Sequence, residues 1–196
     1  SVPLPDCNCY KKRIIARVLA LNCLTSWYKE LYEASFRAWM RCDSWTQSHM
    51  GLNKDFFVAL TPKWSREVAL RTDLERRQAL LELDVLCAMA YGLTLDELIV
   101  SYRMRFQVMR TYDLNTYYDA KGRIVFDPRS KGPGLSGKAK KDDPAVYAVN
   151  GSVKNAPLGF EDVKDMQGGC VSKTFKDDTL GPEPKLRTVN YEAPFF

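Results

Sequence analysis

The spacing of apolar positions predicts two long helices in the first half of the chain. Over residues 11–41 apolar side chains recur every three or four positions, which is the spacing of one helix face, so we expect a long amphipathic helix or two helices in series. A second long helix is predicted over 62–91, because Thr61 followed by proline is a typical start and Gly92 a typical end. Its second half, 80–90, is apolar on nearly every side and is expected in the centre of the core.

A third helix and a hairpin are predicted further along. Thr94 and Glu97 stand three positions apart, the arrangement of a reciprocal capping box, and predict a helix that continues to about Phe106. Aromatic and β-branched residues then flank the turn sequence 119–122, which ends in glycine. This pattern predicts a β-hairpin over 116–126.

The last third of the chain has few periodic positions. Residues 127–169 are rich in Gly, Pro, Lys and Asp, which predicts a loop or partly disordered linker, and 170–176 with 185–192 predict a second hairpin. Because Phe195 and Phe196 end the sequence without a polar tail, we expect this hairpin to be truncated. The fold class is therefore α+β and predominantly helical, with long core helices, a β-hairpin, a basic Gly/Pro/Lys loop and a second short hairpin. The expected regions are 1–127, a helical core with hairpin; 128–169, the basic loop or linker; and 170–196, the C-terminal extended hairpin.

Positive charge is concentrated locally, because the whole chain has a net charge of only +5. Basic side chains interleaved with tyrosines gather in the middle of the sequence and predict contacts with the phosphates of duplex DNA. Two alternatives remain: solvated charge, or ion pairs in which Arg103 and Arg105 neutralise Glu82, Asp84 or Asp96. The predicted DNA-contact set is Arg103, Arg105, Arg110, Lys121, Arg123, Arg129, Lys131, Lys138, Lys140 and Lys141.

The cysteines and the chain start favour a cytoplasmic, soluble protein. Six cysteines lie at irregular spacing, which is typical of scattered reduced thiols rather than of a disulfide framework. Cys7 and Cys9 are separated by one residue and have no recognisable second pair, so we predict no zinc site. The sequence has neither a secretory signal nor an apolar run near the ~20 residues of a membrane helix.

Three short motifs imitate catalytic or cofactor sites. Residues 132–137 spell G-x-G-x-x-G, but no helix with an apolar face follows to present its amino end to a ligand. Residues 177–178 with 183–185 imitate a Mg²⁺ nuclease set, but Pro184 spoils the strand that should present it. His49 is the sole histidine and has no nucleophile signature near it. We therefore predict no catalytic residue, metal or cofactor in this chain, which we do not expect to be an enzyme.

Nine stretches of the sequence resemble, in order and spacing, the carboxyl-terminal region of large bacterial class I DNA methyltransferases of the type IIG restriction-modification kind. The resemblance covers nearly the whole chain beyond Leu21. The stretches are 21–25, 55–64, 69–73, 76–84, 92–98, 102–106, 117–126, 177–180 and 187–195.

The resemblance implies a carboxyl-terminal module that assists DNA binding or target recognition for adenine methylation in phage defence. The family's catalytic Asn/Asp-Pro-Pro-Tyr/Phe loop has no match here, so methyl transfer from S-adenosylmethionine, and any cleavage of DNA, are expected in a methyltransferase region before Ser1. The implied partners are duplex DNA and that region of the same polypeptide. The alternative is a scaffold module that packs against the methyltransferase domain or a partner subunit without contacting DNA.

Overall fold

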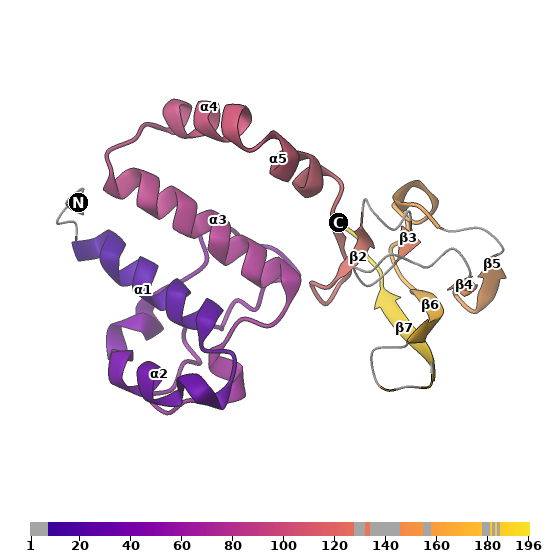
Figure 1. Cartoon of the computed structure of the whole chain (residues 1–196), viewed down its shortest axis with the longest axis horizontal. Helices are drawn as coiled ribbons and strands as arrows, with labels where there is room; N and C mark the ends of the chain where they lie inside the picture. The colour runs from indigo at the N-terminus through magenta and orange to yellow at the C-terminus, as the bar shows by residue number, and fades with distance from the viewer. Residues whose placement is uncertain are drawn as a thin grey trace. The chain divides into compact units, whose positions relative to one another are not determined.

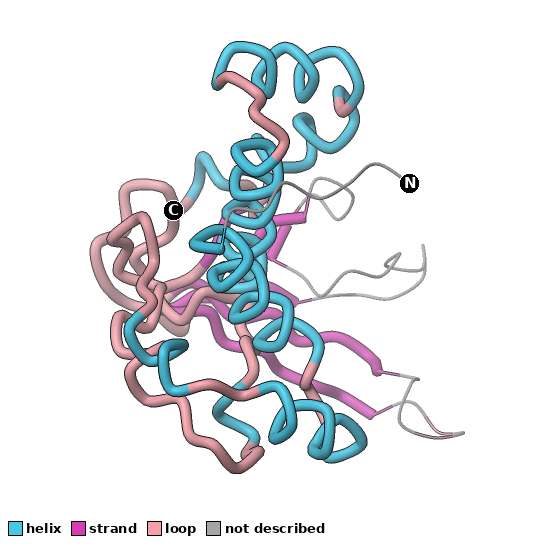
Figure 2. Tube along the Cα trace, turned by 90° about the vertical axis from the view of Figure 1, so that its left-hand side faces the viewer, coloured by secondary structure: helices cyan, strands magenta, loops and turns pink. Residues whose placement is uncertain are grey.

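Helices occupy the first part of the chain and antiparallel strands the second, so the protein has a mixed α+β fold, as the sequence predicts (Figures 1 and 2). The computed structural model describes residues 8–127, 132–133, 146–154, 158–177, 181, 183 and 185–196. The chain divides into two compact units, Ser1–Gln107 and Val108–Phe196.

The first unit is built on α1 and α3, which lie side by side (Figure 1). The helices in the described parts of the chain are α1 (Asn8–Asn22), α2 (Lys29–Ser35), α3 (Asp73–Ala90), α4 (Leu95–Arg105) and α5 (Gln107–Leu114). Short 3-10 turns lie at Ser26–Tyr28, Ala38–Cys42, Arg66–Val68 and Phe160–Asp162. The predicted first helix is therefore two helices in series, separated and followed by tighter turns.

Aromatic and aliphatic side chains from these segments form the core of the first unit. Tyr32, Met40, Phe57 and Leu70 are almost completely buried there. Burial and the neighbouring Cys23 raise the pKa of Tyr32 to about 12. The Tyr32 hydroxyl therefore keeps its proton and donates to the carbonyl of Thr61 at 2.9 Å.

The start predicted for the second long helix is wrong, because α3 begins at Asp73 and not at residue 62. The peptide N–H of Leu70 donates to the carbonyl of Ala20 in α1 at 2.8 Å, which holds the segment before α3 in a non-helical course. Thr72 is the cap, since its side chain accepts a hydrogen bond from the N–H of Glu75. A tertiary contact has overridden the local signal for a helix start.

The expectation that 80–90 lies in the centre of the core is also wrong. Glu82 and Leu86 are buried, but Leu81, Val85 and Met89 expose 42%, 36% and 47% of their surface. The physical reason is that α1 covers one face of α3, while α4, which follows, has no buried residue. An apolar sequence shows that a helix can be buried. It does not show that another part of the chain packs against every face of that helix.

The predicted capping box opens α4. Thr94 Oγ1 accepts from the N–H of Glu97 at 3.3 Å, and Glu97 Oε2 accepts from the N–H of Thr94 at 2.8 Å. The helix ends at Arg105, close to the predicted end. The sequence pattern did not predict the short helix α5, which follows after Phe106.

The predicted hairpin over 116–126 opens the strand-rich second unit. β1 (Tyr117–Tyr118) pairs antiparallel with β2 (Ile124–Asp127), which pairs in turn with β3 (Gly132–Pro133). Gly122 has φ +71°, a left-handed conformation that glycine adopts without strain, and its N–H donates to the carbonyl of Asp119 at 2.8 Å.

A second antiparallel sheet has the strand order β5-β4-β6-β7. Its strands are β4 (Val146–Val149), β5 (Ser152–Lys154), β6 (Cys170–Asp177) and β7 (Lys185–Glu192). The pairing of β6 with β7 confirms the predicted second hairpin. β4 and β5, however, lie inside the region 128–169 that was predicted as a loop, because β4 pairs with the distant β6 and that long-range pairing has no local signal.

The core of the second unit lies between its strands and the chain end. Tyr147, Val163 and Val171 are buried in it together with Phe195. The N–H and carbonyl of Phe196 bond to the carbonyl and N–H of Tyr118 at 3.1 and 2.7 Å. The last aromatic residues are thus accommodated by the fold, Phe195 in the core and Phe196 by pairing with β1.

Candidate functional sites

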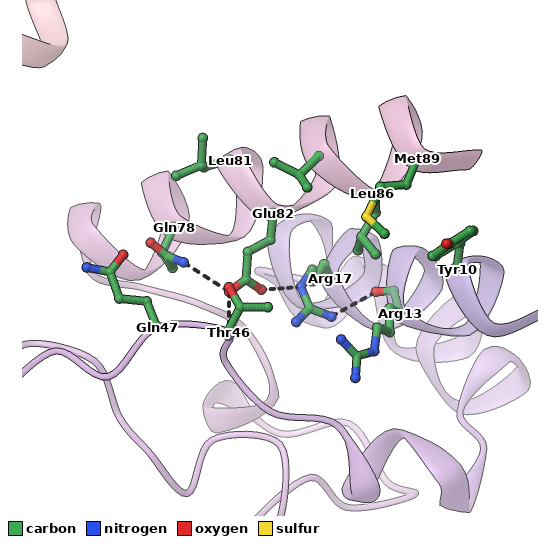
Figure 3. A pocket seen from close by; sticks show the side chains of 11 residues that line it. Tyr10, Arg13, Arg17, Thr46, Gln47, Gln78, Leu81, Glu82, Leu86 and Met89 are labelled. Carbon is green, nitrogen blue, oxygen red and sulfur yellow. Dashed lines mark hydrogen bonds and ion pairs between the residues drawn. The ribbon is translucent and has the colours of Figure 1, made fainter. Parts of the chain in front are cut away.

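A buried ion pair joins α1 to α3 (Figure 3). Arg17, whose side chain is 0% exposed, donates from Nε to Glu82 Oε2 at 2.6 Å. Its Nη1 donates to Asp43 Oδ2 at 2.7 Å and its Nη2 to the carbonyl of Ser44 at 2.9 Å. The guanidinium also lies 5.1 Å from the ring centroid of Phe57. These contacts match the planar donor fork of arginine.

The second carboxylate oxygen of Glu82 is fully used as well. Oε1 accepts from the N–H of Thr46 at 2.8 Å, from Thr46 Oγ1 at 2.6 Å and from Gln78 Nε2 at 2.9 Å. Burial raises the pKa of Glu82, but these hydrogen bonds and the charge of Arg17 outweigh it and hold the pKa below its ordinary value. The stability that this carboxylate adds is present above the ordinary pKa and is lost as the pH falls through the lowered one.

One alternative drawn from the sequence, that Arg103 and Arg105 neutralise Glu82, is wrong for this residue, because the partner of Glu82 is Arg17. No local pattern connects positions 17 and 82, which are 65 residues apart. A signal was nevertheless present, because Arg17 interrupts the buried face of α1 between Ala16 and Ala20. A charge on the apolar face of a helix indicates a buried partner elsewhere in the chain.

A pocket of about 430 Å³ lies beside this ion pair, between α1 and α3 (Figure 3). We call it the α1–α3 pocket. Most of its wall is apolar and comes from α3, whereas α1 and the segment after the 3-10 turn Ala38–Cys42 contribute polar groups. It is lined by Tyr10, Arg13, Arg17, Thr46, Gln47, Gln78, Leu81, Glu82, Val85, Leu86 and Met89.

Five of the ten residues in the predicted DNA-contact set lie in the described parts of the chain, at three places. Arg103 and Arg105 are exposed at the end of α4 in the first unit, and Arg110 is exposed on α5 in the second. Lys121 and Arg123 lie at the β1–β2 turn, also in the second unit. The remaining predicted residues, Arg129, Lys131, Lys138, Lys140 and Lys141, lie outside the described residues.

The two basic residues of the turn are engaged within their own unit. Arg123 donates from Nε to Asp119 Oδ2 at 2.9 Å, and its Nη2 contacts the same oxygen and the carbonyl of Asn190 in β7. Asp119, which is 0% exposed, also accepts from the peptide N–H groups of Lys121 and Arg123 at 3.0 and 2.9 Å. Lys121 Nζ pairs with Glu192 at the surface. The turn is therefore tied to β7 by charge.

Two residues of the motifs that imitate catalytic sites make hydrogen bonds within the fold. Asp177 accepts from Arg187 Nη1 at 3.1 Å, across the β6–β7 pair. Nδ1 of the half-buried His49 accepts from the N–H of Gly51 at 3.1 Å. Of the glycine motif 132–137 only Gly132–Pro133 is described, as strand β3, and Asp178 and Pro184 also lie outside the described residues.

Thiols and acidic groups show no metal-binding arrangement in the described parts of the chain, where no three His, Cys, Asp or Glu side chains are grouped to hold an ion. Cys23, Cys42, Cys87 and Cys170 are free thiols, and burial raises the pKa of Cys23. Within the same ranges, no helix combines the length and the apolar character that crossing a bilayer requires.

Comparisons with known proteins add no relative. No protein-family model matches the sequence, and neither the curated proteins nor the solved structures include a similar protein.

Proposed function

We propose that this chain is a DNA-contacting module, without chemistry of its own, that serves an adenine methyltransferase of a restriction-modification system. The observation that carries the proposal is the exposure of Arg103 and Arg105 at the end of α4 and of Arg110 on α5. From residue 98 to residue 112 the sequence contains these arginines and no acidic residue. This is a local excess of positive charge on accessible helical surface.

Such a segment attracts a phosphate backbone by releasing condensed counterions. Arginine is suited to phosphate because its fork of N–H donors matches the oxygens of the anion. The ring centroids of Tyr102 and Phe106 are 6.2 Å apart, so the end of α4 has an aromatic surface beside its charged side chains. Lys121 and Arg123, by contrast, have their charge balanced by Glu192 and Asp119, and we assign them to the support of the turn.

Replacing Arg103 and Arg105 together by alanine is expected to weaken binding to a mixed-sequence DNA duplex and to make it less sensitive to salt. Each lost phosphate contact lowers the slope of log K against log salt by about 0.9, so the slope should fall by about 1.8. Fluorescence anisotropy of a labelled duplex, titrated at several salt concentrations, measures both quantities.

The matched control is Lys54→Ala with Lys63→Ala, which removes two exposed positive charges from the same unit at positions away from α4. This control should leave the slope nearly unchanged. If both double variants lose the same DNA affinity and the same salt slope, binding depends only on the net charge of the protein and not on the position of Arg103 and Arg105. Absence of salt-dependent binding by the unaltered chain would refute DNA contact altogether.

A second candidate function, a protein-interaction module, is favoured by apolar side chains that the chain leaves exposed. On α4, Leu95, Val100 and Met104 expose 69%, 52% and 71% of their surface. Val100 and Met104 are one helical turn apart and therefore share a side of the helix. Exposed apolar clusters of this kind mark sites where proteins associate. On this proposal the partner is a methyltransferase region of the same restriction-modification system.

Changing Val100 and Met104 together to glutamate is expected to abolish association with that region, produced as a separate polypeptide. Burying each of these side chains contributes about 1.5–3 kcal/mol, so the double change should weaken association by at least about a hundredfold. Sedimentation velocity of the mixture provides the measurement, with Lys54→Glu as a control for added negative charge. If the unaltered chain and that region sediment separately, the interaction role is excluded.

A further inference from the structure

We infer that the α1–α3 pocket binds a small amphiphilic carboxylate, that is, a ligand with an apolar body and one anionic end. The pocket volume of about 430 Å³ falls in the range of small-molecule sites, roughly 300–1,000 Å³. The inference is independent of DNA contact, because Arg103 and Arg105 do not line the pocket.

The wall on α3 supplies a site for the apolar body. Leu81, Val85 and Met89 follow one another at intervals of four residues, so they form a continuous strip along one side of the helix. They keep 42%, 36% and 47% of their surface exposed, whereas Leu86 beside them is buried. Covering this strip removes apolar surface from water, which stabilises a complex by about 25 cal/mol for each Å² covered.

The Arg17–Glu82 pair forms the floor of the pocket. We assign it the role of fixing the shape of the pocket and not that of binding an ion. Both Glu82 oxygens already accept hydrogen bonds, and the guanidinium of Arg17 already donates to two carboxylates, Glu82 and Asp43. A ligand group placed there would have to compete with bonds of 2.6–2.9 Å inside a buried network. The floor therefore offers a rigid surface whose polar groups already have partners.

The anionic end is assigned to Arg13. Its side chain is 50% exposed and lies 3.8 Å from the carboxylate of Asp43, whose own side chain is only 5% exposed. Asp43 is already engaged by Arg17 at 2.7 Å and by the N–H of Ser44 at 2.8 Å, so it holds Arg13 weakly. The guanidinium of Arg13 thus retains N–H donors for a ligand carboxylate, which it can bind in a bidentate manner. The amides of Gln47 and Gln78 line the same pocket and add neutral hydrogen-bonding groups.

The test uses decanoate as the probe, at concentrations below its micelle formation, with 1-decanol and decyltrimethylammonium as ligands of equal chain length. Isothermal titration calorimetry on the whole chain should show that decanoate binds more tightly than decanol and that the cation binds most weakly. Arg13→Met should weaken decanoate by about fivefold, the loss of a half-exposed charged contact, while decanol changes by less than about twofold.

Two further variants separate the apolar wall from the charge. Val85→Trp fills the pocket and should abolish the binding of decanoate and decanol alike, and Met89→Gln, which keeps the side-chain size, should weaken both equally. Arg105→Met and Val100→Trp are the matched controls outside the pocket and should change neither. The inference is overturned if decanoate does not bind, if it binds Val85→Trp as tightly as the unaltered chain, or if Arg13→Met loses decanoate and decanol in equal measure.

Discussion

Replacing Arg17 by methionine should lower the free energy of unfolding of the first unit by about 3–5 kcal/mol, the largest effect we expect from any single change in this unit. Methionine fills much of the same space, but it leaves Glu82 in the interior without its countercharge and Asp43 with only the more distant Arg13, 3.8 Å away. All four tryptophans lie in the first unit, so tryptophan fluorescence during urea unfolding follows this unit selectively.

The control for this experiment is Arg13→Met, one turn earlier on α1. Arg13 is half-exposed and 3.8 Å from Asp43, so its loss should change the free energy of unfolding by less than about 1 kcal/mol. Similar losses in the two variants would mean that the Arg17 network is not a structural tie. A second comparison is Arg17→Met with Glu82→Gln, which removes one of the stranded charges and should recover part of the lost stability.

In the second unit, Asp119→Ala should lower the free energy of unfolding by about 2–4 kcal/mol. The change leaves the peptide N–H groups of Lys121 and Arg123 without their acceptor, at about 1–3 kcal/mol for each one that stays buried. It also releases the guanidinium of Arg123 from its carboxylate. Hydrogen exchange measured by mass spectrometry on peptides from 117–126 and 185–192 reports this unit alone.

Glu192→Gln is the matched control, because it breaks the surface pair with Lys121, whose side chain is 57% exposed. That pair should contribute no more than about 1 kcal/mol, so protection in both peptides should remain nearly as in the unaltered chain. Loss of protection confined to the turn peptide in Asp119→Ala would contradict the tie between the turn and β7.

The parts of the fold that the sequence predicts well are those that neighbouring residues determine. Thr94 and Glu97 form their capping box, and the turn before Gly122 joins two strands, because each arrangement is decided within a few positions. The start of α3 could not be predicted in the same way. Proline after Thr61 favours a helix there, but the hydrogen bond from Leu70 to α1 depends on a segment some fifty positions earlier.

The candidate sites also differ in whether neighbouring residues or long-range packing determine them. Exposed charge at Arg103, Arg105 and Arg110 follows from the local sequence, since no acidic residue lies among them. The pairing of Arg17 with Glu82 does not, because it requires α1 and α3 to be side by side first. The α1–α3 pocket was missed for a related reason, since α3 supplies more apolar surface than α1 covers and the sequence alone does not say how much is left.

The contacts around the β1–β2 turn also affect how the second sheet can associate with other molecules. Among the described strands, β7 is the last in its sheet, so its outer side presents a row of backbone groups that can pair with another strand. At one end these groups are already occupied, because the carbonyl of Glu192 accepts from the N–H of Ala120 at 2.9 Å and that of Asn190 from Arg123. A strand from another molecule that paired with this end of β7 would have to displace the turn. By holding the turn in place, Asp119 and Arg123 therefore disfavour edge-to-edge aggregation of the protein.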